Sequence, residues 1–221
     1  MTKYKWILLA FASVWIVGMF VVYPMIKKHE RLMVFQPVHV NPELVDVDMQ
    51  RTAKAHRIAD FSLSDQNGNT VSNQNFEGKI YVADFFFTTR PSICPKMTAN
   101  LSELSVFYKD DSDIMFLSHS VTPEKDSIPV LKEYAAKHNV NGEKWKLVTG
   151  SKSHIYELAR RSYFAVTTEG DGGENDFIHT ENFILVDKER KIRGFYDGTS
   201  KADMQKLKDD IVILRYEYEE D

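Results

Sequence analysis

The sequence predicts an α/β domain with a mixed sheet between layers of helices, preceded by one membrane-spanning helix. Two observations predict the domain. Segments of strand length alternate with segments of helical periodicity from about Ile58 to Leu214. One of them, the run IYVADFFF after Lys79, is apolar almost throughout, as expected of a central strand covered on both faces. A third observation predicts the helix, because residues 6–26 carry no charge.

The apolar segment 6–26 has the length of a transmembrane helix. As an α-helix it extends roughly 30 Å, which is the thickness of the hydrocarbon core of a bilayer. A cleaved signal peptide is the alternative. We favour a retained anchor because the one small-x-small site, Ala10 to Ala12, lies inside the apolar run rather than after it. Basic residues on both sides leave the orientation open.

The chain divides by composition into four parts. We expect a membrane anchor at 1–28, a tether without helical or strand periodicity at 29–57, one domain at 58–214, and an acidic tail at 215–221. The net charge of −4 provides no basic stripe for phosphate backbones, so we do not expect nucleic acid as a partner. No glycine-rich phosphate-binding motif follows any predicted strand.

The domain begins with a predicted β-hairpin, in which Phe61 and Leu63 alternate with polar residues before the turn cluster at 65–69. Further strands are expected at 80–87, 114–121, 145–148, 182–187 and 192–196. Helices are expected at 95–108, 127–138, 151–162 and from Ser200 onward. This order, α/β units followed by a closing hairpin and helix, best matches a thioredoxin-like three-layer α/β/α domain with a mixed sheet.

Cys94 is the only cysteine of the chain and lies where the central strand gives way to a helix. Because Pro95 suits a first helical turn, the helix amides should point at the sulfur, and Arg90 adds positive charge. Both effects stabilise a thiolate. The alternative is a buried cysteine that packs as a small apolar residue. A single cysteine forms no intramolecular disulfide, which excludes a dithiol oxidoreductase.

Four segments carry a resemblance to a known family. They read FFFTTRPSICPKM, DFIHTENFILVD, NQNFEGK and SVTPEKDS. The chain resembles the SCO/SenC proteins, which are thioredoxin-like copper chaperones and assembly factors of cytochrome c oxidase. The resemblance implies copper as the metal, and cytochrome oxidase or its assembly factors as partners. It also implies a membrane anchor with the domain on the periplasmic or otherwise extracytoplasmic side.

The resemblance also assigns the site residues. The family loop reads TxCPxxCP, and its two cysteines bind copper together with a distant histidine. Cys94 takes the place of the second cysteine, His179 that of the histidine, and Arg90 stands where the first cysteine would be. A guanidinium has no lone pair for a metal and repels a cation, so the site is degenerate. His119, near the end of a predicted strand, is the auxiliary ligand we consider, whereas Met97 is expected in the core.

Three functions remain open at this stage. The first is a copper metallochaperone or oxidase assembly factor that keeps Cys94 and His179 as ligands. The second is a single-cysteine thiol protein that exchanges disulfides with a partner. The third is a non-catalytic scaffold that docks a partner. We favour the first because the resemblance extends over the whole domain, which is an argument by analogy.

Overall fold

The computed structural model describes residues 11, 13, 15, 18, 31–36, 56–89, 93–166 and 177–220. Most of the predicted anchor and tether, Arg90 and the loop at 169–176 lie outside these residues, as do the side chains at 93–95. No helix within the described ranges is long and apolar enough to cross a bilayer. The described residues form two compact units, one between Met33 and Lys208 and one that joins the N-terminal residues to those from Asp209 onward.

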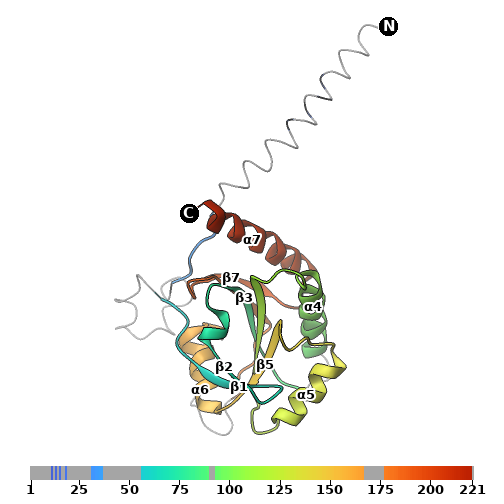
Figure 1. Ribbon diagram of the computed structural model, residues 1–221, viewed down its shortest axis with the longest axis vertical. Helices are drawn as coiled ribbons and strands as arrows, with labels where there is room; N and C mark the ends of the chain where they lie inside the picture. Colours follow the sequence, from blue (N-terminus) through green and yellow to red (C-terminus); the bar gives the residue numbers. More distant parts are fainter. Residues whose placement is uncertain are drawn as a thin grey trace. The chain divides into compact units, whose positions relative to one another are not determined.

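Seven strands form one mixed sheet in the order β2-β1-β5-β4-β3-β6-β7 (Figure 1). Strand β4 is parallel to β3 on one side and to β5 on the other, and all other pairs of neighbouring strands are antiparallel. The predicted mixed sheet is confirmed. The strands are β1 Ser62–Asp65, β2 Thr70–Ser72, β3 Ile80–Phe86, β4 Ile114–Ser120, β5 Trp145–Thr149, β6 Asn182–Val186 and β7 Ile192–Asp197.

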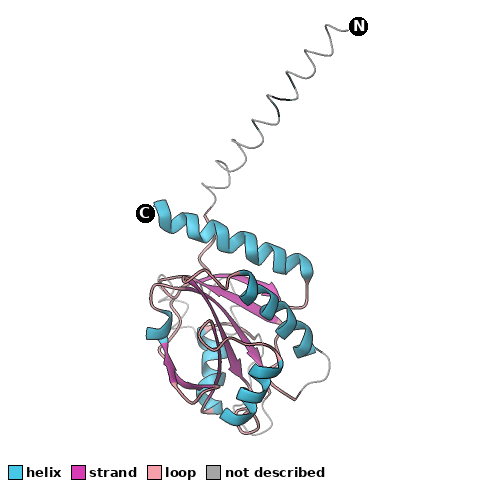
Figure 2. Cartoon of the chain, turned by 45° about the vertical axis from the view of Figure 1, so that its right-hand side comes forward, coloured by secondary structure: helices cyan, strands magenta, loops and turns pink. Residues whose placement is uncertain are grey.

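The helices, drawn in cyan in Figure 2, begin and end close to the predicted residues. They are the short 3-10 helix η3 Asn73–Phe76, then α4 Ile93–Phe107, α5 Ile128–Lys137, α6 Lys152–Glu157 and α7 Lys201–Glu220. Helix α6 continues as a π-helical turn, η4 Leu158–Ser162. Helix α7 runs through most of the segment expected as an acidic tail, where Glu217 accepts a hydrogen bond from the Leu32 amide at 2.6 Å.

The order of the strands places the helices on both faces of the sheet. The chain moves in one direction from β3 to β4 to β5, so right-handed crossovers place α4 and α5 on the same face. Helix α6 lies on the opposite face, where Ile155 packs in one core cluster with Tyr81 and Phe85 of β3. Figure 1 shows this arrangement of α4 and α5 opposite α6. The three-layer prediction agrees with it.

Strand β3 is buried over its whole length, as its apolar sequence predicts. Its alternate side chains point to opposite faces, because the period of a strand is two. Tyr81, Ala83 and Phe85 contribute to the core on the α6 face, together with Ile155 and other residues of that region. Both faces of the strand are therefore covered.

Candidate functional site

The pairing of β3 with β6 brings the segments next to the two predicted metal ligands to one edge of the sheet. The pairing is antiparallel, with Tyr81 opposite Val186 and Ala83 opposite Ile184. The carboxyl end of β3 therefore lies beside the start of β6. The loop after β3 leads to Cys94, and the segment before β6 carries His179. Two segments about 85 positions apart in the sequence thus meet through one strand register.

Side-chain contacts hold these two segments together. The rings of Phe87 and Phe177 meet edge to face, with centroids 5.1 Å apart. Phe87 directly follows β3, and Phe177 lies two residues before His179. Phe177 remains 47% exposed and His179 is also exposed, so this edge is accessible to a partner molecule. The amide of Gly198, in the turn after β7, donates to the carbonyl of Glu181 at 2.7 Å.

Cys94 lies in the first turn of α4, as the predicted strand-to-helix junction requires. The side-chain amide of Asn100 in the same helix donates to the Gly198 carbonyl at 2.7 Å, which links α4 to the segment of His179. Lys96 follows Cys94 by two residues. The pKa of Asp197 is lowered by hydrogen bonds from Thr199 and, to a lesser extent, by the positive charge of Lys96. The helix start therefore carries positive charge beside the cysteine position.

The loop after β3 is also held from the side of β4. The hydroxyl of Thr88 donates to a carboxylate oxygen of Asp126 at 2.6 Å, and Asp126 is completely buried. Asp126 belongs to the segment SVTPEKDS, which contributed to the family resemblance, but the sequence did not indicate its role. Its partner lies 38 positions away, so only the parallel pairing of β3 and β4 reveals the contact.

His119 lies in the core and has no exposed surface. Its ring stacks on Phe85 at 4.8 Å and makes edge contacts with Phe61 and Tyr163. Nδ1 is 3.3 Å from the carbonyl oxygen of Asp84, and Nε2 has no hydrogen-bond partner among the described residues. Burial lowers the pKa of His119 to about 4, so the ring is neutral at physiological pH. Its role as an auxiliary copper ligand stays a prediction.

Met97 is 3% exposed and packs in the core, as predicted. Within the described ranges, no three His, Cys, Asp or Glu side chains are grouped so that they could hold a metal ion. The predicted site contributes two donors, Cys94 and His179. A thiolate and an imidazole are suitable donors for copper, but two protein ligands are fewer than a closed site uses. The donor set therefore fits copper only in part.

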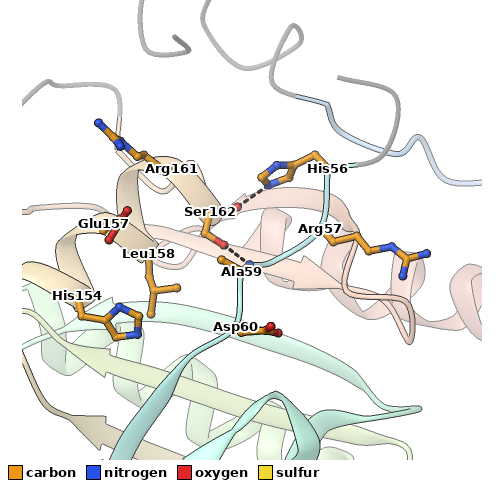
Figure 3. A pocket seen from close by; sticks show the side chains of 9 residues that line it. All are labelled: His56, Arg57, Ala59, Asp60, His154, Glu157, Leu158, Arg161 and Ser162. Carbon is orange, nitrogen blue, oxygen red and sulfur yellow. Dashed lines mark hydrogen bonds between the residues drawn. The ribbon is translucent and has the colours of Figure 1, made fainter. Parts of the chain in front are cut away.

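A separate hollow of about 380 Å³ lies between the segment before β1 and the π-helical turn η4 (Figure 3). His56 contacts the Ser162 carbonyl through Nε2 at 2.8 Å, and the Ala59 amide donates to the Ser162 hydroxyl at 2.8 Å. Arg57 and Arg161 also line the hollow, and Figure 3 shows their side chains pointing away from each other. None of the predicted site residues lines it. Its charged groups do not converge on one point.

The fold and this edge of the sheet define the class of the protein. Thioredoxin-like proteins have a mixed sheet whose central strand leads through a short loop into a helix with a cysteine in its first turn, and this chain has the same arrangement. Residues 49–212 match the SCO1/SenC family model. The chain belongs to this family.

Individual relatives agree with the family. The chain is 32% identical over 158 residues to the SCO1 protein homolog of Bacillus subtilis, which covers 71% of this chain and 81% of that protein. BsSco, a member of the Sco family of cytochrome c oxidase assembly proteins with an identified disulfide switch, is 31% identical. Its structure superposes with a TM-score of 0.60 over 72% of this chain and 94% of its own. Arabidopsis thaliana ScoI with copper bound is 26% identical, with a TM-score of 0.56 over 75% and 99% of the two chains.

Proposed function

We propose that this protein is a membrane-anchored copper metallochaperone or respiratory oxidase assembly factor with a degenerate metal site. Cys94 and His179 supply the two protein ligands for copper, which is cargo rather than a resident cofactor. One observation carries the proposal: the β3–β6 pairing brings the segments of both residues to one exposed edge. The relatives with bound copper and with a part in oxidase assembly support the same reading.

The chemistry of the two ligands favours Cu(I) as the cargo. A thiolate is a soft donor that prefers Cu(I), and a neutral imidazole also binds copper well. Arg90, in place of a second cysteine, donates no lone pair and repels a cation. The site therefore holds copper more weakly than a site with two thiolates. We infer that a partner, the oxidase or one of its assembly factors, supplies the missing ligand when copper is transferred.

A second candidate function uses the thiol without a metal. Cys94 lies in the first turn of α4 beside Lys96, and both the helix terminus and a nearby cation favour a thiolate. Such a thiolate attacks a disulfide of a partner and forms a mixed disulfide. With one cysteine in the chain, the partner must provide the thiol that resolves it. Under this function, His179→Ala leaves the reactivity of Cys94 unchanged.

The membrane anchor completes the proposal. Residues 6–26 hold the protein in the membrane, with the domain outside the cytoplasm, where it reaches the oxidase. Protease digestion of intact cells or spheroplasts tests this arrangement. We expect the domain to be cleaved only when the protease has access to the extracytoplasmic side. A domain that is protected until the membrane is broken would contradict the orientation.

Copper binding is tested by titrating the full-length chain with Cu(I) against a chromophoric chelator. Cys94→Ser and His179→Ala should each weaken binding by about tenfold or more, because each removes one of only two protein ligands. His154→Gln, which alters a histidine distant from Cys94 in the sequence and on another helix, is the matched control and should bind as the wild type does. If wild type and Cys94→Ser bind Cu(I) equally weakly, direct copper transfer by this protein is excluded.

A further inference from the structure

The carboxyl group of Asp126 is the centre of a buried hydrogen-bond network that joins the ends of β3 and β4. The hydroxyl of Thr88 donates to Oδ1 at 2.6 Å, and the Thr88 amide donates to Oδ2 at 3.4 Å. From the other side, the hydroxyls of Ser120 and Thr122 donate to Oδ2 at 2.6 and 3.0 Å. We call these four residues the Asp126 network. It accounts for both oxygens of the carboxyl group.

The local backbone directs Asp126 inward. The amides of Lys125 and Asp126 both donate to the carbonyl of Thr122, at 2.8 and 2.9 Å, which closes a tight turn after β4. The amide of Val121 donates to the Phe86 carbonyl at 2.9 Å and extends the β3–β4 pairing by one residue beyond β4. The turn therefore places the carboxyl group beside the first residues of the loop that follows β3.

The network is stabilised by hydrogen bonds and not by opposite charge. Asp126 has no exposed surface, and no lysine or arginine among the described residues forms an ion pair with it. A buried carboxyl group is tolerated only when hydrogen-bond donors replace its lost hydration. A fully satisfied polar network of this kind fixes one arrangement of the backbone, because any other arrangement leaves a buried group without a partner.

We infer that Asp126 is a positioning residue for the candidate copper site, and this inference rests on the proposed function. Thr88 lies six residues before Cys94, on the loop that enters α4. The helix itself is held independently, because the hydroxyls of Thr98 and Tyr134 are 2.6 Å apart and hydrogen-bonded. Asp126 thus holds Thr88, near the start of the loop that leads to Cys94.

Correct positioning matters to Cys94 in two ways. Stabilisation of a thiolate by a helix terminus falls off within the first turn, so a shift of the loop raises the proportion of the less reactive thiol. Copper ligands also tolerate only small changes in donor distance, since metal sites keep their bond lengths within about 0.2 Å. Loss of the Thr88 hydrogen bond should therefore lower both the reactivity of Cys94 and the affinity for Cu(I).

The test compares three variants of the full-length chain, because Asp126→Ala removes every bond at once and is prone to misfolding. Thr88→Val removes one hydroxyl with little change of shape, and Thr88→Ser keeps that hydroxyl. Ser162→Ala is the control, because it removes a buried hydroxyl that accepts a hydrogen bond from the Ala59 amide and lies outside the Asp126 network. Two quantities are measured: the rate of Cys94 alkylation by iodoacetamide at neutral pH without metal, and Cu(I) affinity against a chelator. Urea unfolding reports the stability of each variant.

We expect Thr88→Val to lower the alkylation rate by about two- to fivefold, the range that a helix terminus contributes to an anion, and to weaken Cu(I) binding. Thr88→Ser should restore both, and Ser162→Ala should lower stability without changing the alkylation rate. The inference is overturned if Thr88→Val reacts as the wild type does, or if Ser162→Ala slows alkylation equally. If the wild type fails to bind Cu(I) while Thr88→Val still slows alkylation, the proposed function fails and the positioning role stands.

Discussion

Two buried groups of the central strands should give the stability of this protein opposite dependences on pH. Burial raises the pKa of Asp84 to about 7 from the ordinary 3.8, although its hydrogen bond from Ser118 acts in the opposite direction. Burial lowers the pKa of His119 to about 4 from the ordinary 6.5. Both side chains are almost or completely inaccessible to solvent, so bulk water does not screen these effects. Between about pH 4 and 6.5 both groups are neutral in the folded chain.

The sign of each contribution follows from the protons bound in the folded and unfolded states. Above pH 4 the unfolded chain releases the proton of Asp84 while the folded chain keeps it, so the free energy of unfolding falls as pH rises. The total loss by pH 7 is on the order of 4 kcal/mol. Below pH 6.5 the unfolded chain protonates His119 and the folded chain does not. The free energy of unfolding therefore rises between pH 4 and 6.5, by on the order of 3 kcal/mol.

In the wild type, the pH dependences of the Asp84 and His119 contributions to the free energy of unfolding nearly cancel. Substitution of one residue should reveal the contribution of the residue that remains. Asp84→Asn keeps an acceptor oxygen for the Ser118 hydroxyl. In this variant only His119 contributes, so the free energy of unfolding of the variant should rise from pH 4.5 to 6.5 relative to that of the wild type. His119→Phe keeps an aromatic ring against Phe85 and should show the reverse trend. The double variant should regain the pH dependence of the wild type.

Urea unfolding at intervals between pH 4.5 and 7.5, followed by circular dichroism, measures these slopes. The difference between variant and wild type at each pH removes the contributions of surface groups that both proteins share. A difference of on the order of 2 kcal/mol should develop across this range for each single variant. Parallel curves for Asp84→Asn and wild type would show that Asp84 titrates normally, which would refute the reasoning.

Three further predictions concern the site and the core. Arg90→Cys adds a second thiolate and should raise the Cu(I) affinity more than about tenfold in chelator competition, whereas an unchanged affinity would mean that position 90 does not face Cys94. Gly194→Ala places a methyl group against the hydroxyl and ring of the buried Tyr196, so urea unfolding should show a loss of about 1–3 kcal/mol. Leu101→Ala empties a fully buried position of α4 and should cost about 2–5 kcal/mol, and a smaller loss would indicate that the core collapses around it.

The sequence predicted the strands and helices well because their patterns are local. The apolar run of β3 indicates a strand covered on both faces, and the structure buries all seven of its residues. The position of His119 depends on more than local pattern. Its place near the end of a strand is visible in the sequence, but the register that sets it beside Phe85 and the burial of its ring are not. Its role as an auxiliary ligand stays a prediction.

The Asp126 network illustrates the other limit of prediction from sequence. The turn residues of SVTPEKDS are visible in the sequence, and so is Thr88 in the loop before Cys94. Their contact follows from the parallel pairing of β3 with β4, which a single sequence does not specify. A hydrogen bond between two loops, such as the one between Thr88 and Asp126, depends on which strand ends lie side by side. It can be predicted only when the order of the strands in the sheet is known.

The same network bears on the choice between a copper protein and a scaffold that only docks a partner. A docking surface needs a stable fold and exposed groups, which this edge provides in Phe177 and His179. It does not need a buried carboxyl group to hold Thr88, since apolar residues of the same shape can replace a buried hydrogen-bonded pair at little cost. Holding Thr88, near the start of the loop that leads to Cys94, is useful when the sulfur must meet a metal or a disulfide at a defined distance. We therefore expect a chemical role for Cys94 rather than simple docking.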